Sequence, residues 1–458
     1  MKKRSSRAKT RTTVKTKNQT QFKNLAIAIV AILVLVIVVT NVKGYRIAVG
    51  EAATSDLVRM WPSFLLEDVE NDSTLSDSNA VINLKGGATP ALPGPTDIMT
   101  PYAFVSNTSK HPYYLYGTVY YASGNGASPK MLYGGNCASA IPSGDYVFCV
   151  HIDVIDSDNI PVTTTPIKID TRSATYGRIT TLGDSGYWPT LVNSVVPAKA
   201  GTDYIVTAMD ADVDSPNYLT GPITIVRDGV EFGRYAGSFL QLALSSDGAQ
   251  VAWVSKSGNR QVFGNGDLYT YNLDTGASQR LYNAGLTQEC AGPSLTKTGM
   301  FRAFSLIGID PAAPSILRQY VYINFANENK KIDMSQLPIG SYYHWNSNVK
   351  ISDNGLGLVW QGKRERVLGP GNRGYNILAA GIFPINADIG DAFQIFPYDG
   401  TQRRRLPDLA DDGFVIFSNW LGGTSTNYGI FGTRAFKNAP MFSIFNPAGM
   451  DLAATFMR

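Results

Sequence analysis

The sequence is poor in cysteine and histidine, and each scarcity excludes a class of protein. Three cysteines in 458 residues are too few for a fold held together by disulfides. The three histidines, His111, His151 and His344, are dispersed without ligand spacing, which argues against a zinc site and against Ser-His-Asp chemistry. A G-x-S-x-G nucleophile elbow is also absent. We therefore assign no catalytic residues, and a protein without enzymatic activity is favoured although an enzyme stays open.

Charge is scarce as well, at 17% of residues, and the net charge of +4 is misleading. Nine lysines and arginines lie within the first 24 residues, and the first acidic residue is Glu51. Setting those nine aside leaves 31 basic residues against 36 acidic ones. The basic excess therefore belongs to the N-terminal tail, and we expect the folded domain to bind no nucleic acid.

One long apolar run, residues 25–42, predicts a transmembrane signal-anchor helix that binds the chain to the membrane. The basic tail, 1–24, precedes it, and only Lys43 and Arg46 follow closely, so the tail is expected in the cytoplasm. This predicts a single-pass protein of the cell membrane with an extracytoplasmic main domain. A cleaved signal peptide is the alternative. Residues 43–95 are interpreted as a juxtamembrane helix and a linker rich in Ser, Asp, Gly and Pro.

Glycine, proline and tyrosine are plentiful, which fits many short strands better than helices. A repeated pattern supports this: an apolar residue, a turn ending in glycine, then a strand, as in LSSDGAQVAWVS and ISDNGLGLVWQG. Seven such turns occur 36 to 58 residues apart, at Gly144, Gly201, Gly248, Gly299, Gly355, Gly413 and Gly449.

A second element follows each turn and predicts another hairpin, as in the segments 267–281 and 391–406. Two hairpins per repeat make a four-stranded unit that must stack on its neighbours to be buried. We therefore predict an all-β domain over residues 96–458, a β-propeller of about seven four-stranded blades. The segment 117–133 has no first hairpin before it and is predicted to complete the last blade. Six or eight blades, or a tandem array of β-sandwiches, are the alternatives.

LSSDGAQVAWVS followed by DLYTYNLDTGASQRL resembles the WD-repeat-like propeller repeats of the Tol-system periplasmic protein. It is also similar to the propeller domains of prolyl oligopeptidase and dipeptidyl peptidase enzymes. The resemblance covers roughly residues 100 to 458 and implies a fold. The catalytic domain that accompanies those peptidase propellers finds no counterpart here, so their activity is not carried over.

Three groups of residues are candidates for structural or binding roles. Cys137 and Cys149 lie twelve apart and are predicted either to form a disulfide or to be two buried thiols. Asp210, Asp212 and Asp214 alternate as at the start of a calcium loop, so they predict either a structural calcium site or a solvated hairpin tip. Trp188, His344 and Trp345 are predicted to bind a ligand from the rim of the propeller, on connections between blades. The run Arg403 to Arg405 is expected on a solvated outer edge.

From these observations we predict a membrane-anchored propeller that acts as a protein-binding or scaffolding module of the cell envelope. Its partner would be another envelope protein, and no cofactor beyond the calcium ion is expected. Two alternatives remain: a hydrolase acting on envelope carbohydrate or peptide, and a subunit of a surface filament or secretion apparatus.

Overall fold

The computed structural model describes the chain between residues 94 and 457. It leaves out residues 108–115, 158–160, 199, 213, 216–220, 238, 256–265, 286–287, 311–312, 326, 335–336, 338–342, 365–374, 384–387, 391, 397–402, 422–427, 438 and 447–449. All described residues belong to one compact unit, Ser63–Arg458.

The predicted cytoplasmic tail, spanning helix 25–42 and most of the linker lie outside the described residues. The membrane anchor therefore stays a prediction. Within the ranges that are described, no helix is both long and apolar enough to cross a membrane.

A short 3-10 helix, η1 (Pro95–Asp97), precedes a succession of antiparallel sheets made from strands that are neighbours in the sequence. The first group contains β4 (Ile141–Ser143), β5 (Tyr146–Ile155), β6 (Pro161–Asp170), β7 (Ile179–Thr181) and β8 (Gly186–Tyr187). The second contains β9 (Thr190–Pro197), β10 (Tyr204–Asp210), β11 (Gly221–Arg227) and β12 (Val230–Gly237). The third contains β13 (Phe239–Leu244), β14 (Gln250–Ser255), β15 (Leu268–Asn272) and β16 (Ser278–Tyr282).

The same order continues toward the C-terminus. The next group contains β17 (Gln288–Leu295), β18 (Arg302–Asp310), β19 (Ala313–Phe325) and β20 (Glu328–Lys331). It is followed by β21 (Tyr343–Ile351), β22 (Gly357–Arg364), β23 (Tyr375–Phe383), β24 (Asp388–Ile389) and β25 (Phe393–Gln394). Then come β26 (Arg404–Leu409), β27 (Phe414–Trp420), β28 (Tyr428–Arg434) and β29 (Phe442–Phe445).

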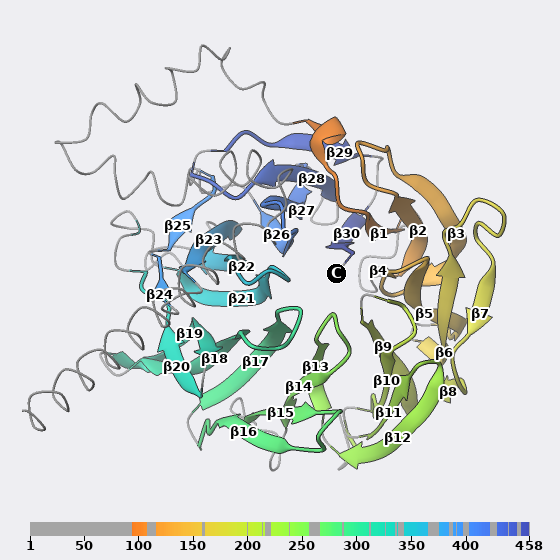
Figure 1. Cartoon of the computed structure of the whole chain (residues 1–458), viewed down its shortest axis with the longest axis horizontal. Coiled ribbons are helices and arrows are strands. Elements are labelled where there is room, and N and C mark those ends of the chain that lie inside the picture. Colours follow the sequence, from red (N-terminus) through yellow and green to blue (C-terminus); the bar gives the residue numbers. More distant parts are fainter. Residues whose placement is uncertain are drawn as a thin grey trace, which may run out of the picture. The chain divides into compact units, whose positions relative to one another are not determined.

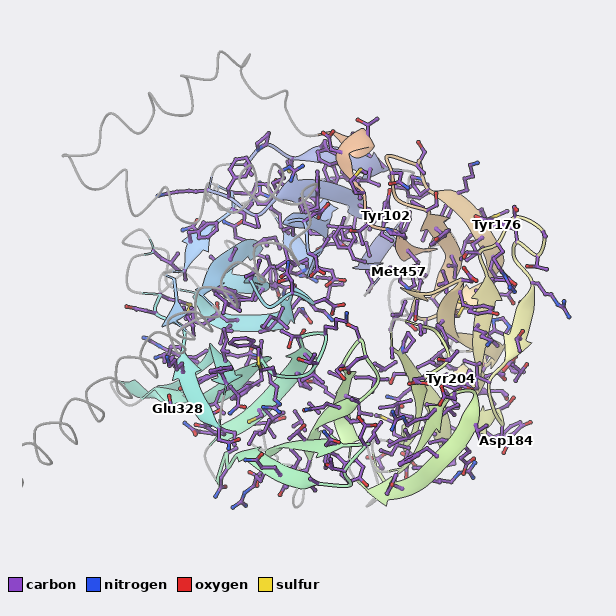
Figure 2. All side chains as sticks on the ribbon, in the orientation of Figure 1. Tyr102, Tyr176, Asp184, Tyr204, Glu328 and Met457 are labelled. Atoms are coloured by element: carbon purple, nitrogen blue, oxygen red, sulfur yellow. A yellow bond between two sulfur atoms is a disulfide. The ribbon has the colours of Figure 1, made fainter. Side chains whose placement is uncertain are left out.

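One sheet joins strands from the two ends of the described chain. β30 (Met450–Phe456) pairs antiparallel with β1 (Tyr102–Asn107), which pairs with β2 (Gly117–Ala122) and through it with β3 (Lys130–Cys137). Met457 N also donates to Pro101 O at 2.7 Å, and Figure 2 shows Met457 and Tyr102 near this junction. The predicted closure by strands from both ends is present, with β1 as an additional strand that the repeat pattern did not reveal.

The sheets form a ring in which each packs against the next, as Figure 1 shows. The packing partners run β5 with β9, β9 with β13, β13 with β17, β17 with β21, β22 with β26, and β26 with β30. β30 and β1 then pack against β4, which closes the circle. The first strand of each sheet lies nearest the middle of the ring. This is the radial stacking of a β-propeller, in which each sheet buries both of its faces.

Buried residues lie between neighbouring sheets because alternate residues of a strand face opposite ways. In β5, Val147 and Cys149 join one core cluster, whereas Phe148 and Val150 join another. A single strand therefore contributes to two interfaces. The sheets cannot be separated without exposing apolar surface on both sides.

The repeated turns connect the first and second strands of their sheets, and the structure explains their glycines. Gly144, Gly201, Gly248, Gly299, Gly355 and Gly413 all have positive φ, between 54° and 79°. At Gly248, a Cβ atom would also lie 2.5 Å from the Asp203 carboxylate of the preceding sheet. Neighbouring turns are joined by main-chain bonds, such as Lys297 N to Asp353 O at 3.0 Å. The turns therefore need glycine both for their conformation and for close packing.

Two sequence expectations about the repeat are wrong. The strand after Gly449 is β30, a first strand, so the segment around Gly449 leads into a sheet and does not connect first and second strands. Residues 391–406 are not one hairpin, because β25 ends one sheet and β26 begins the next. Arg404 is therefore on an inner strand and is 5% exposed, in contrast to the solvated outer edge that we expected for this run.

Asp170, at the end of β6, gives the propeller a predicted acid sensitivity. Its carboxylate accepts hydrogen bonds from Arg172 Nε at 3.0 Å and Thr175 Oγ1 at 2.7 Å. The Arg172 hydrogen bonds hold the pKa of this carboxyl below its ordinary value. Because the folded-state pKa is lowered, the stabilisation is present above the unfolded pKa of about 3.9 and is lost as the pH falls below it. Asp170→Asn is expected to cost roughly 1–3 kcal/mol at pH 7.

Thermal unfolding of wild type and Asp170→Asn between pH 3 and pH 7 measures this effect. The gap in melting temperature should be widest at pH 7 and should narrow below about pH 4. Asp274→Asn is the matched control, since Asp274 is exposed and pairs with Arg227 at 2.7 Å. A gap that is constant with pH would contradict the assignment.

Candidate functional site

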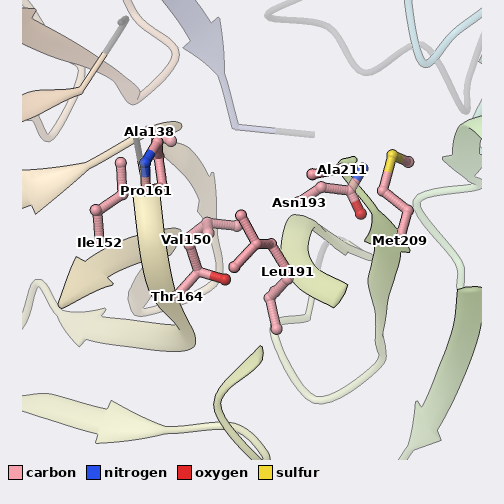
Figure 3. A pocket seen from close by; sticks show the side chains of 10 residues that line it. Ala138, Val150, Ile152, Pro161, Thr164, Leu191, Asn193, Met209 and Ala211 are labelled. Atoms are coloured by element: carbon pink, nitrogen blue, oxygen red, sulfur yellow. The ribbon is translucent and has the colours of Figure 1, made fainter. Parts of the chain in front are cut away.

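A pocket lies where the sheet of β5 and β6 meets the sheet of β9 and β10 (Figure 3). Its volume is about 260 Å³. The lining is mainly apolar and comprises Ala138, Val150, Ile152, Pro161, Thr164, Leu191, Val192, Asn193, Met209 and Ala211. Concave, largely apolar sites with a few polar groups are typical of ligand binding.

Strand alternation positions these side chains. Val150 and Ile152 face the pocket from β5, whereas His151 belongs to the opposite face. Thr164 lies directly across from Ile152 on β6 and is 3% exposed. Its Oγ1 is a buried atom without a hydrogen-bond partner within the described structure. The pocket thus combines apolar walls with one unused hydroxyl group.

Trp188 lies beside this pocket, on the connection from β8 to β9. The main-chain N–H of Trp188 donates to Val162 O at 3.0 Å, next to the lining residue Pro161. The carbonyl of the following residue, Pro189, accepts from the N–H of Ala211, another lining residue, at 2.8 Å. The indole is 45% exposed. The main chain of Trp188, one of the ligand-binding residues predicted from the sequence, is therefore bonded next to a pocket.

The aspartates predicted to bind calcium begin at Asp210, the last residue of β10, which lies between the lining residues Met209 and Ala211. Asp210 is 7% exposed and accepts from Asp212 N at 2.9 Å, while Asp212 accepts from Asp214 N at 3.0 Å. The alternating spacing therefore lets each carboxylate accept a hydrogen bond from the main-chain N–H two residues later. Among the described residues, no three acidic, histidine or cysteine side chains gather in a way that could hold a metal ion.

The opposite face of β5 and β6 carries a polar chain of contacts that the sequence did not reveal. His151 Nε2 lies 3.6 Å from Asp153 Oδ1, and Asp153 Oδ2 accepts from Thr165 Oγ1 at 2.6 Å. Thr165 Oγ1 also lies 2.5 Å from Ser185 Oγ. Burial, and secondly the charge of Asp153, raise the pKa of the neighbouring Tyr133.

This chain of contacts does not have the order of a serine hydrolase triad. The histidine is at its end, and Asp153 and Thr165 separate it from Ser185. A triad requires the histidine between the serine and the carboxylate. The i, i+2 spacing of His151 and Asp153 on a strand was the signal in the sequence that could have paired them.

His344 and Trp345 lie within β21, where Trp345 pairs with Lys363 of β22. We had expected them on a connection between blades. The structure therefore places them on a different element from Trp188.

The structure joins Cys137 and Cys149 in a disulfide, with their Cα atoms 5.8 Å apart. Both residues are fully buried, and they link the end of β3 to β5. Cys290 is a free, buried cysteine whose thiol pKa is raised by burial. The disulfide fixes the wall of β5 from which Val150 and Ile152 enter the pocket.

Comparison with known proteins shows the fold. No protein-family model and no curated protein matches the sequence. Among solved structures, the chain is similar to the β-propeller domain of the Trilobed protease from Pyrococcus furiosus, with a TM-score of 0.50 and 10% identity, over 76% of this chain and 92% of that one.

It is also similar to the acylaminoacyl peptidase of Pyrococcus horikoshii, with a TM-score of 0.50 and 10% identity, over 76% of this chain and 51% of that one. A prolyl endopeptidase structure matches with a TM-score of 0.49 and 12% identity, over 84% of this chain and 56% of that one. The chain thus spans about half the length of the two whole peptidases.

These similarities correct one sequence-based prediction. We had interpreted the chain as a protein-binding or scaffolding module of the cell envelope. The propellers that it resembles come instead from a protease and a peptidase, and the hydrolase alternative fits them better. Fold and likeness together establish a β-propeller.

Proposed function

We propose that this chain is the propeller of a peptide-acting hydrolase and that its pocket between β5 and β9 takes up an apolar side chain of the peptide. The observation that carries the proposal is the similarity to the propellers of a protease and an acylaminoacyl peptidase. Since a fold hosts many functions, the pocket has to supply the specific argument.

The pocket suits a peptide in three respects. Val150, Ile152 and Leu191 offer apolar contact to an aliphatic side chain. Thr164 Oγ1 is buried without a partner and can hydrogen-bond a peptide amide. Trp188, whose main chain is bonded next to the lining residue Pro161, is exposed and offers a flat surface for the rest of the peptide.

The proposal assigns peptide capture, and no hydrolytic step, to the residues of this pocket. His151 and Asp153 form the one histidine–carboxylate ion pair recorded for the described residues, and Ser185 is not next to that histidine. Catalytic groups would have to act on a peptide that the propeller holds.

We also propose that the ring has seven blades, six formed by consecutive strands and one by β30 with β1, β2 and β3. The strand pairings and the circular order of contacts support this number. A crystal structure with another number of inner strands would refute it. The WD-repeat-like character of the repeats rests on the sequence pattern alone.

Peptide capture is tested by measuring binding of a library of short peptides to the full chain. Peptides with a leucine or isoleucine side chain should bind in preference to those with lysine or aspartate, because the walls are apolar. The variant Ala138→Trp, which places an indole at the pocket opening, should weaken this binding at least about tenfold.

Val230→Trp is the matched control, since Val230 is 69% exposed on β12 and does not line the pocket. It should bind peptides like the wild type. Failure of the wild-type chain to bind any peptide of the library would refute the proposed function. Binding that Ala138→Trp leaves unchanged would refute the pocket as its site.

A further inference from the structure

Three consecutive arginines, Arg403, Arg404 and Arg405, mark the beginning of the inner strand β26. Their guanidinium groups lie over aromatic rings: Arg403 over Trp420 with 5.1 Å to the ring centroid, Arg404 over Phe396 at 4.5 Å, and Arg405 over Tyr375 at 4.1 Å. Arg405 also lies 5.6 Å from the ring centroid of Tyr428. Stacking on rings fixes the planes of the guanidinium groups and leaves their edges for hydrogen bonding.

The backbone next to this cluster is held in an uncommon conformation. Leu406 has φ of 51°, which is rare for a bulky residue, and the pairing of β26 with β27 shifts register between Arg405 and Asp408. Leu406 N donates to Gln361 Oε1 at 3.1 Å, and Asn348 Nδ2 donates to the same oxygen at 3.3 Å. β-bulges re-aim side chains and are frequent next to functional sites. The bulge thus sets the direction of Arg405.

Buried polar atoms without hydrogen-bond partners gather around the same strands. Three of them share the face that carries Arg405: Arg405 Nε, Ser418 Oγ and Tyr428 OH. Ser418 pairs in register with Arg405 on the neighbouring strand. Ser418 and Tyr428 are 0% and 1% exposed. Buried polar groups in proteins are normally satisfied, so three such atoms on one face indicate a bound polar group.

The charge of the cluster indicates which kind of group. Over the described part of the chain, no ion pair involves Arg403 or Arg405. Both are partly exposed, so a ligand can reach them from solvent. Arginine charges next to buried hydroxyl donors favour an anion.

We infer that this arginine cluster binds a carboxylate group, with Arg405 as the principal anchor and the Ser418 and Tyr428 hydroxyls as further donors. A guanidinium fork matches the two oxygens of a planar carboxylate. On the basis of the proposed function, the natural source of the carboxylate is the C-terminus of the captured peptide.

The inference is tested with pairs of ligands that differ only in the carboxylate. A leucine-containing peptide with a free C-terminus should bind the full chain at least about tenfold more tightly than the same peptide as its amide. In Arg405→Gln the ratio of acid to amide affinity should fall to about one. In Arg405→Lys the ratio should fall to an intermediate value, because lysine keeps the positive charge but lacks the paired N–H donors of the guanidinium group. Arg234→Gln, an exposed arginine on β12, is the control that should keep the full ratio.

A second pair, N-acetyl-leucine and its amide, separates this inference from the proposed function. The acid at millimolar concentration should raise the melting temperature of the full chain by roughly 1–3 °C and the amide should not. If no peptide binds but the acid stabilises the chain, the proposed function fails and the carboxylate site stands. Equal effects of acid and amide in both assays, or a larger stabilisation by inorganic phosphate, would overturn the inference.

Discussion

Replacing Phe456 by alanine is expected to lower the free energy of unfolding of the whole propeller by about 3–5 kcal/mol. Phe456 is 1% exposed on β30, the strand that closes the ring against β1. Its ring packs edge-on against Tyr102 of β1, with 6.3 Å between the centroids. The loss should be global because Phe456 also belongs to the core shared by the first and last strands of the described chain.

Chemical denaturation of wild type and variant measures this loss. Phe232→Ala is the matched control, since Phe232 is 46% exposed on an outer strand, and it should cost less than about 1 kcal/mol. A double-mutant cycle with Tyr102→Ala should give a coupling energy of about 0.5–1.5 kcal/mol between the two rings. If Phe456→Ala were no more destabilising than its control, β30 would not close the ring.

Replacing Trp360 by alanine is expected to cost a similar amount, about 3–5 kcal/mol. Trp360 is fully buried on β22 and donates from Nε1 to Asn346 Oδ1 at 2.9 Å. Asn346 Nδ2 in turn donates to Gln319 O, on the preceding sheet, at 2.7 Å. The substitution therefore opens a cavity and also interrupts a buried hydrogen-bonded connection between two sheets.

The repeat supplies a matched control. Trp253 occupies the equivalent position, five residues after the turn glycine Gly248 as Trp360 is after Gly355, but it is only partly buried and stacks on Tyr269. Trp253→Ala should cost roughly 1–2 kcal/mol. Trp360→Phe should lose about 1–3 kcal/mol, because the buried hydrogen bond from Trp360 Nε1 to Asn346 Oδ1 is then lost. Equal losses for the two alanine variants would show that burial at this repeat position does not decide stability.

The local elements of the propeller follow closely from the sequence. Six turn glycines predicted from the repeat are at positive φ, because such turns exclude residues with a Cβ atom. The hairpin predicted at residues 267–281 is β15 and β16. Turn conformation and strand alternation depend on neighbours in the chain, and a single sequence records them directly.

The errors concern which strand is inner and which is outer. Residues 391–406 have the sequence pattern of a hairpin, but they connect the last strand of one sheet to the first strand of the next. Arg404 therefore lies on a buried inner strand, although we expected it on a solvated edge. Strand position in a blade depends on pairing with residues far away in the sequence. The sequence pattern of neighbouring residues does not determine the position of a strand within its blade.

In the candidate sites, too, the sequence indicates single residues, whereas the neighbours of those residues depend on strand pairing. The sequence singled out Trp188, but the pocket beside it is built from β5, β6, β9 and β10, and no local motif connects these strands. The Ser418 and Tyr428 hydroxyls meet Arg405 only because β26, β27 and β28 pair.

The sequence by itself determined a repeated all-β chain, the glycines of its turns and its closure by strands from both ends, since each depends on backbone conformation and on the period of the pattern. Only the tertiary structure decided which strands face the middle of the ring, which polar groups are buried without partners and where a pocket opens. These properties arise from packing between sheets, and packing joins residues whose separation in the sequence carries no signal.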